Sequence, residues 1–187
     1  MSFIAHMIKF PISPTKNKFK SIDCNAMGYI YSYKKRRSID DAACLSSCDS
    51  IDMVKNRSCS GIGCCQTSIL EGLSQFYVVA NNMGAPSKEL AAFNPCTYAF
   101  IVEEKAYNFS FLDFRGIINT LLMVVNWAVG NHTCHDAQKQ LTSYACKAMH
   151  GECYIATNSL GYHCKCASGF PGNPYLLHDC QGINIHI

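Results

Sequence analysis

The sequence predicts an all-β, disulfide-rich fold: an irregular, β-rich, cysteine-rich domain followed by a small module built on one hairpin. The middle of the chain has short segments in which apolar and polar residues alternate, and these segments are rich in β-branched and aromatic side chains. Cysteine makes up 13 of the 187 residues, and the cysteines are bunched. Such a high content is typical of chains that are crosslinked by disulfides or by metal.

The predicted strands lie in the middle of the chain, where turn-forming Gly, Pro and Asn separate them. They comprise residues 76–80, 97–104, 107–111 and 121–129. Only short helical turns are expected, for example around residues 134–141 or 40–48. With 49% hydrophobic and 16% charged residues, the chain has enough apolar side chains to fold around a core.

Two apolar regions resemble membrane or targeting segments only superficially. The stretch 117–129 is short and contains two asparagines, so it does not suffice to span a bilayer. The N-terminal residues lack the uninterrupted apolar run of a secretory signal, because Lys9, Pro11 and Pro14 break it. We therefore expect no transmembrane segment and no signal peptide in this chain.

The C-terminal part changes character at about Asn131, where Gly, Asn and Cys replace the alternating pattern. A module of about 47 residues buries too little apolar surface to offset its chain entropy, so it needs covalent or metal crosslinks. Zinc sites usually present two close pairs of ligands, whereas this module has one close pair of cysteines. Disulfides are the better account, although six cysteines alone allow fifteen connectivities. The six are Cys134, Cys146, Cys153, Cys164, Cys166 and Cys180.

The segment GYHCKCASGFPG at residues 161–172, with the cysteine spacing around it, resembles an epidermal-growth-factor-like module. Many such modules bind calcium through an Asn or Asp two residues after the third cysteine. This chain has Ile155 at that position, which offers no side-chain oxygen, so we expect no metal there. The resemblance also implies three disulfides: Cys134 with Cys153, Cys146 with Cys164, and Cys166 with Cys180.

Four upstream segments carry a wider resemblance: NKFKSIDC at 17–24, CSGIGCCQTSI at 59–69, NPCTYAFIVEE at 94–104 and VVNWAVGNHTC at 124–134. Together they resemble the extracellular region of plant wall-associated receptor-like kinases. The resemblance implies a partial galacturonan-binding-like, cysteine-rich β domain at residues 17–131 and an epidermal-growth-factor-like module at residues 132–182. Residues 1–16 are then an atypical N-terminal segment, and residues 183–187 are a tail.

The chain also departs from that family. The family's secreted leader, its earliest cysteine-containing segment, its membrane helix and its kinase are not recognisable, so the chain resembles a truncated member. No Gly-rich phosphate loop or catalytic-loop motif for phosphoryl transfer is found in the sequence. His132 and His135 flank Cys134, but that cysteine is needed as the first disulfide cysteine of the module. We expect no enzyme activity and no cofactor.

The cysteines upstream of the module are odd in number, so at least one thiol is unpaired. They are Cys24, Cys44, Cys48, Cys59, Cys64, Cys65 and Cys96. A bridge between the adjacent Cys64 and Cys65 is conceivable, but ordinary disulfide geometry favours separate partners. The sequence does not assign these pairs.

Pectic galacturonan is a polyanion, so binding it requires Lys and Arg together with aromatic faces for the sugar rings. The N-terminal third is basic, because residues 1–65 carry ten Lys and Arg against five Asp and Glu. On a strand, the three tyrosines of YIYSYKKRR at residues 29–37 would share one face. This segment supplies the candidate ligand-binding residues Tyr29, Tyr31, Tyr33, Lys34, Lys35, Arg36 and Arg37.

The same segment has simpler interpretations. The run of four basic residues is not part of the family pattern that we recognise. A solvated basic loop beside a tyrosine-lined core strand would have the same sequence. Four basic residues also occur in segments that bind nucleic acid, but the disulfide-like spacing of the cysteines argues against nucleic acid as a partner.

The sequence thus predicts a non-catalytic fragment that binds pectin or galacturonan, at the cell-wall face of the plasma membrane as the family resemblance implies. The alternatives are a module that binds an extracellular protein and a truncated product without function. Asn-x-Ser/Thr sequons at Asn56, Asn108 and Asn131 are candidate N-glycosylation sites in a secreted product.

Overall fold

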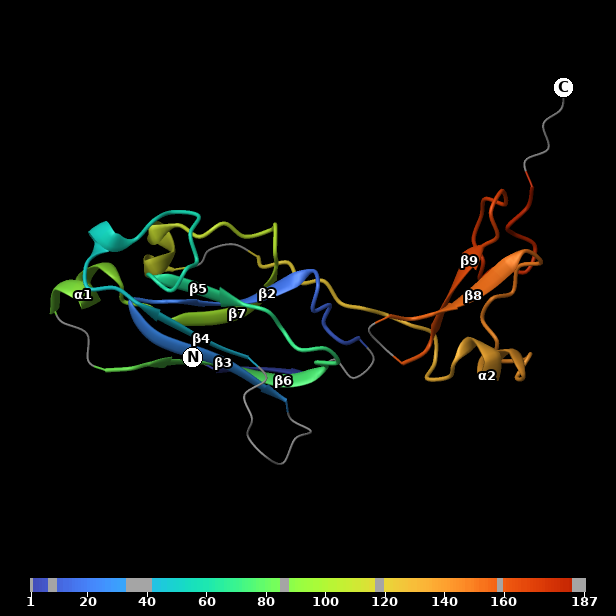
Figure 1. Cartoon of the computed structure of the whole chain (residues 1–187), viewed down its shortest axis with the longest axis horizontal. Coiled ribbons are helices and arrows are strands. Elements are labelled where there is room, and N and C mark those ends of the chain that lie inside the picture. Colours follow the sequence, from blue (N-terminus) through green and yellow to red (C-terminus); the bar gives the residue numbers. More distant parts are fainter. Residues whose placement is uncertain are drawn as a thin grey trace, which may run out of the picture. The chain divides into compact units, whose positions relative to one another are not determined.

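The computed structural model describes residues 2–6, 10–32, 42–84, 88–116, 120–157 and 160–182. It divides into two compact units, residues 1–125 and residues 126–187 (Figure 1). The described residues form mostly strands with few helices, and six disulfides crosslink them. The predicted all-β, disulfide-rich fold class is confirmed.

The first unit contains two antiparallel sheets. The four-stranded sheet has the order β1-β6-β3-β4 and the three-stranded sheet the order β5-β2-β7. The first is formed by β1 (Ser2–His6), β6 (Gln75–Asn82), β3 (Asn25–Ser32) and β4 (Ala42–Ser47). The second is formed by β5 (Cys64–Thr67), β2 (Asn17–Ile22) and β7 (Tyr98–Glu103). The short helical elements are η1 (Ile51–Met53), α1 (Lys88–Phe93) and η2 (Phe111–Arg115).

The main hydrophobic core contains side chains from both sheets. Phe19 of β2 and its register partner Ile101 of β7 belong to it, together with Ile30 of β3 and Phe76 of β6. Because successive residues of a strand point to opposite faces, each of these strands directs every second side chain to this core. The outward side chains of the four-stranded sheet are therefore available for other contacts.

The opposite face of the three-stranded sheet supports a second core. Ile22 and Val102 point to this face and pack with Tyr107, Phe109 and Phe114 from the segment after β7. The rings of Phe109 and Phe114 meet edge to face with their centroids 5.7 Å apart, an arrangement that aromatic pairs favour. The first unit therefore has three layers, of which the three-stranded sheet is the middle one.

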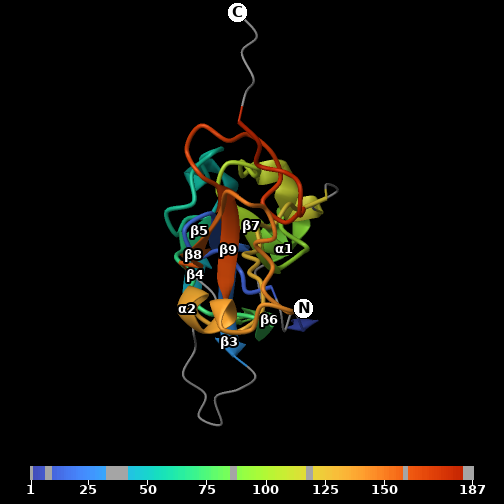
Figure 2. The same ribbon diagram turned by 90° about the vertical axis from the view of Figure 1, so that its right-hand side faces the viewer.

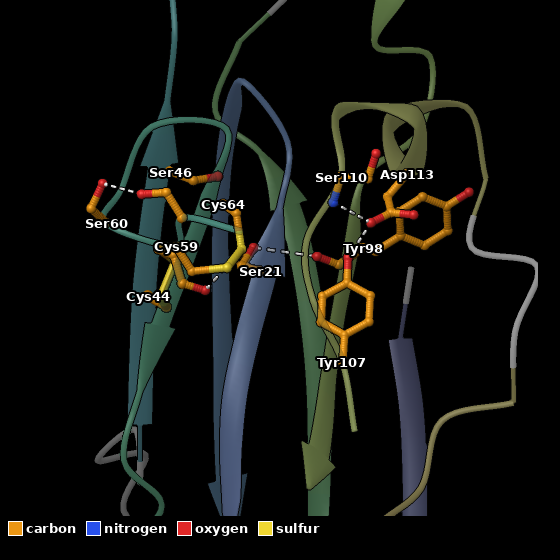
Figure 3. Close-up of a disulfide and its surroundings, with 12 residues drawn as sticks. Ser21, Cys44, Ser46, Cys59, Ser60, Cys64, Tyr98, Tyr107, Ser110 and Asp113 are labelled. Atoms are coloured by element: carbon orange, nitrogen blue, oxygen red, sulfur yellow. Dashed lines mark hydrogen bonds between the residues drawn. A yellow bond between two sulfur atoms is a disulfide. The ribbon is translucent and has the colours of Figure 1, made fainter. Parts of the chain in front are cut away.

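The adjacent cysteines at the start of β5 form disulfides on opposite faces of the middle sheet. Cys65 is part of the main core and bonds to Cys44 of β4. Cys64 is part of the second core and bonds to Cys59 in the loop before β5 (Figure 3). Separate partners for the two cysteines follow from the alternation of side chains along a strand.

The other upstream cysteines form one further disulfide and one free thiol. Cys24, in the turn after β2, bonds to Cys48 at the end of β4. Cys96 is the free cysteine and is half-buried. An unpaired thiol is what an odd number of upstream cysteines requires.

The second unit is a small hairpin with one short helix. β8 (Gly151–Ile155) pairs with β9 (Tyr162–Cys166), and α2 (Cys134–Gln138) and the loop after β9 lie toward opposite ends of this hairpin (Figures 1 and 2). Three disulfides crosslink the unit around a small core: Cys134–Cys153, Cys146–Cys164 and Cys166–Cys180. These are the pairs that the growth-factor-like resemblance implies.

The structure confirms some of the predicted elements and corrects others. The predicted strands 76–80 and 97–104 correspond to β6 and β7, and the helical turn after residue 134 is α2. The helical turn at residues 40–48 is wrong, because residues 42–47 are β4. The strand at residues 107–111 is wrong as well. Tyr107 and Phe109 alternate as in a strand, but they pack onto the second core from a loop that leads into η2.

The predicted strand at residues 121–129 is also wrong, because this segment makes only isolated bridges to Ile12 and Tyr162. A buried side chain holds its first half instead. Asn17 donates from Nδ2 to the carbonyl oxygen of Val124 at 2.7 Å and accepts from the nitrogen of Val124 at 2.9 Å. The backbone of Val124 is thus hydrogen-bonded by the side-chain amide of Asn17 and not by a neighbouring strand, as the apolar pattern suggested.

Gly28 determines how closely β3 approaches the three-stranded sheet. A Cβ atom at this position would lie 2.8 Å from Cβ of Ser21 and 3.1 Å from Cζ of Phe19, both on β2. The first distance is too short for two carbon atoms, so any side chain at residue 28 forces the two sheets apart. β3 carries the candidate tyrosines, so this contact also determines where they lie.

We expect Gly28→Ala to reduce the free energy of unfolding by about 1–3 kcal/mol because it overpacks the core. The measurement is the midpoint of urea unfolding with the disulfides intact. Gly84→Ala is the matched control, because Gly84 is exposed and the nearest atom to its added Cβ lies at 3.5 Å. Equal midpoints for both variants would contradict the close approach of the two sheets.

Asp23 connects four segments of the first unit. Its carboxylate accepts hydrogen bonds from the backbone nitrogen of Asn25 and from the side chains of Asn94 and Thr97. Its backbone nitrogen donates to Gly63 and its carbonyl oxygen accepts from the hydroxyl of Ser46. Asp23 is 1% exposed. Among the described residues, this buried carboxylate accepts hydrogen bonds from neutral donors only.

We expect Asp23→Asn to destabilise the first unit by about 2–3 kcal/mol, because the new NH2 group replaces one of the two acceptor oxygens and faces the donor of either Asn94 or Thr97. Asp49→Asn, which removes the same charge at an exposed position, serves as the control. Urea unfolding of both variants is the test. An Asp23→Asn midpoint equal to that of the control would mean that the buried hydrogen bonds contribute nothing.

Candidate functional site

The tyrosines of the predicted ligand-binding segment lie on the outward face of the four-stranded sheet. Buried and half-buried residues alternate along β3, and the buried ones include Ala26 and Ile30. Tyr29 and Tyr31 occupy the alternate, half-buried positions and share one face. They are not among the side chains of the core between the sheets.

Tyr77 of β6 joins these two tyrosines. Tyr31 and Tyr77 are register partners, and their rings stack with centroids 4.8 Å apart and 11° between the planes. The rings of Tyr29 and Tyr31 lie 6.0 Å apart, and Nδ2 of Asn81 donates to Oη of Tyr29 at 3.3 Å. We call Tyr29, Tyr31, Tyr77 and Asn81 the tyrosine face. The sequence analysis missed Tyr77, although its place in an alternating strand was a signal for it.

The charged part of the predicted site lies outside the described residues. Tyr33, Lys34, Lys35, Arg36 and Arg37 fall in the interval 33–41, which follows the end of β3 directly. The structure thus brings Tyr29 and Tyr31 together with Tyr77, and the basic run follows β3 in the sequence.

The tyrosine face combines two chemical properties. Tyrosine rings offer apolar faces for the C–H side of a sugar ring, and their hydroxyl groups offer hydrogen bonds. Part of each ring face is covered, because the rings stack on one another. The arrangement is suited to a ligand that lies along the sheet surface.

A second polar group of residues lies on the face of the three-stranded sheet that supports the second core. Burial raises the pKa of Tyr107, and the hydrogen bond from its hydroxyl to Asp113 raises it further. The phenol therefore remains a neutral donor, at 2.5 Å from the Asp113 carboxylate (Figure 3). The same carboxylate accepts from the nitrogen of Ser110 and so caps η2. Lys18 and Lys20 of β2 point to this face as well.

The three candidate glycosylation residues, Asn56, Asn108 and Asn131, are all exposed. Two of them lie on neighbouring segments, because the nitrogen of Arg57 donates to the carbonyl oxygen of Phe109 at 2.7 Å. Oδ1 of Asn56 accepts from the nitrogen of Phe111 at 2.9 Å. An N-linked glycan is attached to the other atom of the amide, Nδ2, so this hydrogen bond is compatible with glycosylation.

The described residues provide no other obvious chemical centre. Cys134, the cysteine flanked by two histidines, is bonded to Cys153 and is not a free thiol. No group of His, Cys, Asp and Glu within these ranges is arranged to hold a metal ion. None of the helices described is long and apolar enough to cross a membrane.

Comparisons with known proteins identify relatives over nearly the whole chain. Wall-associated receptor kinase 2 of Arabidopsis thaliana is 37% identical over 174 residues, which are 90% of this chain and 22% of that protein. Wall-associated receptor kinases 5 and 3 of the same plant are 34% and 33% identical over 176 and 184 residues. The chain thus spans about 22–24% of the length of these relatives. No family model and no solved structure matches it.

The aligned part of each relative is its N-terminal, extracellular region and not its kinase domain. The resemblance noted in the sequence is therefore confirmed. The chain belongs to the wall-associated receptor kinase family and corresponds to the ectodomain region of its members.

Proposed function

We propose that this chain is a non-catalytic, extracellular module that binds pectic galacturonan. The observation that carries the proposal is the tyrosine face, and in the sequence the basic run Lys34–Arg37 comes shortly after β3, which carries two of its tyrosines. Aromatic faces beside cationic side chains suit a polymer that has apolar ring faces and a carboxylate on each unesterified sugar. Membership of a family of wall-associated receptors supports a ligand in the cell wall.

A second candidate function is binding of an extracellular protein through the second unit. Trp127 is 48% exposed and Tyr154 is 46% exposed, and the rings of both lie against His163, with centroids 4.8 and 5.2 Å from it. Exposed aromatic side chains of this size are enriched in protein interfaces. Galacturonan binding and protein binding would thus use different units of the chain.

We expect a quadruple variant to bind de-esterified oligogalacturonide about tenfold more weakly, or weaker still. In this variant Ala replaces Lys34, Lys35, Arg36 and Arg37. The reason is that each exposed ion pair contributes from a fraction of a kcal/mol up to about 1 kcal/mol to binding. Higher salt should weaken wild-type binding, because exposed charges are screened over about 8 Å at physiological ionic strength. Isothermal titration calorimetry of the protein, secreted with an added leader, measures both effects.

The matched control replaces four exposed lysines elsewhere, Lys55, Lys88, Lys105 and Lys139, and so removes the same charge. Methyl-esterified oligogalacturonide is the ligand control, because esterification removes the carboxylates. Unchanged affinity of the quadruple variant, or equal affinity for the esterified ligand, would overturn the proposed site.

The tyrosine face generates a separate expectation. Tyr31→Leu keeps an apolar side chain on β3 but removes the ring between Tyr29 and Tyr77. The affinity for oligogalacturonide should therefore fall about tenfold, which is the range of one aromatic stacking contact. Tyr144→Leu in the second unit is the control, because its ring stacks on Tyr162 within the described part of that unit. Equal affinities of the two variants would mean that the tyrosines stabilise the sheet but do not bind the ligand.

A further inference from the structure

Tyr31 and Tyr77 place two phenol rings in close, nearly parallel contact. They are register partners on the neighbouring strands β3 and β6, so the pairing of the strands holds the two side chains next to each other. Their ring centroids lie 4.8 Å apart, and the angle between the ring planes is 11°. Both side chains occupy half-buried positions and do not belong to the core between the sheets. The sheet thus presents a preformed pair of stacked phenols on its outward face.

Two other tyrosine pairs are arranged less closely. Tyr29 and Tyr31 lie two residues apart on β3, with ring centroids 6.0 Å apart and 25° between the planes. Tyr144 and Tyr162 of the second unit lie 5.7 Å apart, also at 25°. Tyr162 is only 2% exposed, and its hydroxyl accepts a backbone hydrogen bond at 2.8 Å. A reaction that needs two accessible, parallel phenols therefore favours Tyr31 and Tyr77.

Stacked phenol rings are arranged for oxidative coupling. When a phenol loses one electron and one proton, the unpaired electron of the phenoxyl radical occupies π orbitals, which extend above and below the ring plane. Two such radicals therefore join through their faces, and a carbon–carbon bond forms between carbon atoms ortho to the hydroxyl groups. The hydrogen atoms on these two carbons then move to the oxygens. This shift restores two aromatic phenols, now joined as dityrosine.

We propose that Tyr31 and Tyr77 are a site of oxidative modification, at which hydrogen peroxide and a haem peroxidase convert the pair to dityrosine. The peroxidase removes one electron and one proton from each phenol. Hydrogen peroxide receives both electrons and both protons and is reduced to two water molecules, so the protein loses two hydrogen atoms in total. The step needs no bound galacturonan, because it involves the two rings alone.

The new bond adds a crosslink where the disulfides provide none. Neither β3 nor β6 contains a cysteine, so no disulfide starts from either strand. β3 and β6 are the two central strands of the four-stranded sheet. A bond between Tyr31 and Tyr77 joins them covalently and holds the tyrosine face in one arrangement. Oxidation therefore stabilises the first unit, because a crosslink restricts the unfolded chain.

The test treats the folded, disulfide-bonded protein, secreted with an added leader, with hydrogen peroxide and a soluble haem peroxidase at low protein concentration. We expect the monomer to lose the mass of two hydrogen atoms and to gain the fluorescence of dityrosine. Peptide mapping should locate the new bond between Tyr31 and Tyr77. The oxidised monomer should also unfold at a higher urea concentration than untreated protein.

Three variants show whether the stacked pair is responsible. Tyr31→Phe and Tyr77→Phe keep two stacked rings but remove a hydroxyl group that the radical requires, so each should lose the Tyr31–Tyr77 product. Tyr144→Phe, from the pair in the second unit, is the control and should form this product as wild type does.

Four results would overturn the site. They are the absence of a coupled monomer in wild type, the same coupled product in both Tyr31→Phe and Tyr77→Phe, dimers as the sole coupled product, and a bond that maps to Tyr29 or Tyr33 in place of Tyr31.

Discussion

The structure of the first unit depends on two neighbouring cysteines that point in opposite directions. Because β5 is a strand, Cys64 and Cys65 extend into different layers, and each finds its partner there. One bond fixes the four-stranded sheet to the three-stranded sheet, and the other fixes the loop before β5 beneath the second core. Each disulfide restricts the unfolded chain, which is how a unit with small sheets remains stable.

Hydrogen bonds of buried polar side chains fix the positions of segments that the disulfides do not crosslink. Asp23 joins the turn after β2 to the segment before β7, and Asn17 fixes the chain near Val124 to the start of β2. These contacts help to position the side chains on the faces of the two sheets. The tyrosine face lies on the outward side of the four-stranded sheet, whereas Lys18 and Lys20 lie on the face of the three-stranded sheet that supports the second core.

Local patterns in the sequence predicted those features that depend on neighbouring residues. The alternation in residues 76–80 and 97–104 gave correct strands, and the shared face of Tyr29 and Tyr31 followed from the same rule. Features that depend on contacts between residues distant in the sequence could not be predicted from local patterns. The alternating residues 107–111 became a loop because Tyr107 and Phe109 pack onto a sheet from outside, and the pairing of Cys44 with Cys65 joins two different sheets. The cation–π contact between Lys20 and Tyr107 likewise joins two segments that are distant in the sequence.

Disulfide mapping of the secreted, unreduced protein shows most directly whether sulfur crosslinks define the layers. Peptide mapping with electron-transfer fragmentation can separate the bonds of adjacent cysteines. We expect Cys64 to be bonded to Cys59 and Cys65 to Cys44. Cys96 should be a free thiol that an alkylating reagent labels. A bridge between Cys64 and Cys65, or reduced or zinc-bound cysteines in the upstream unit, would contradict it.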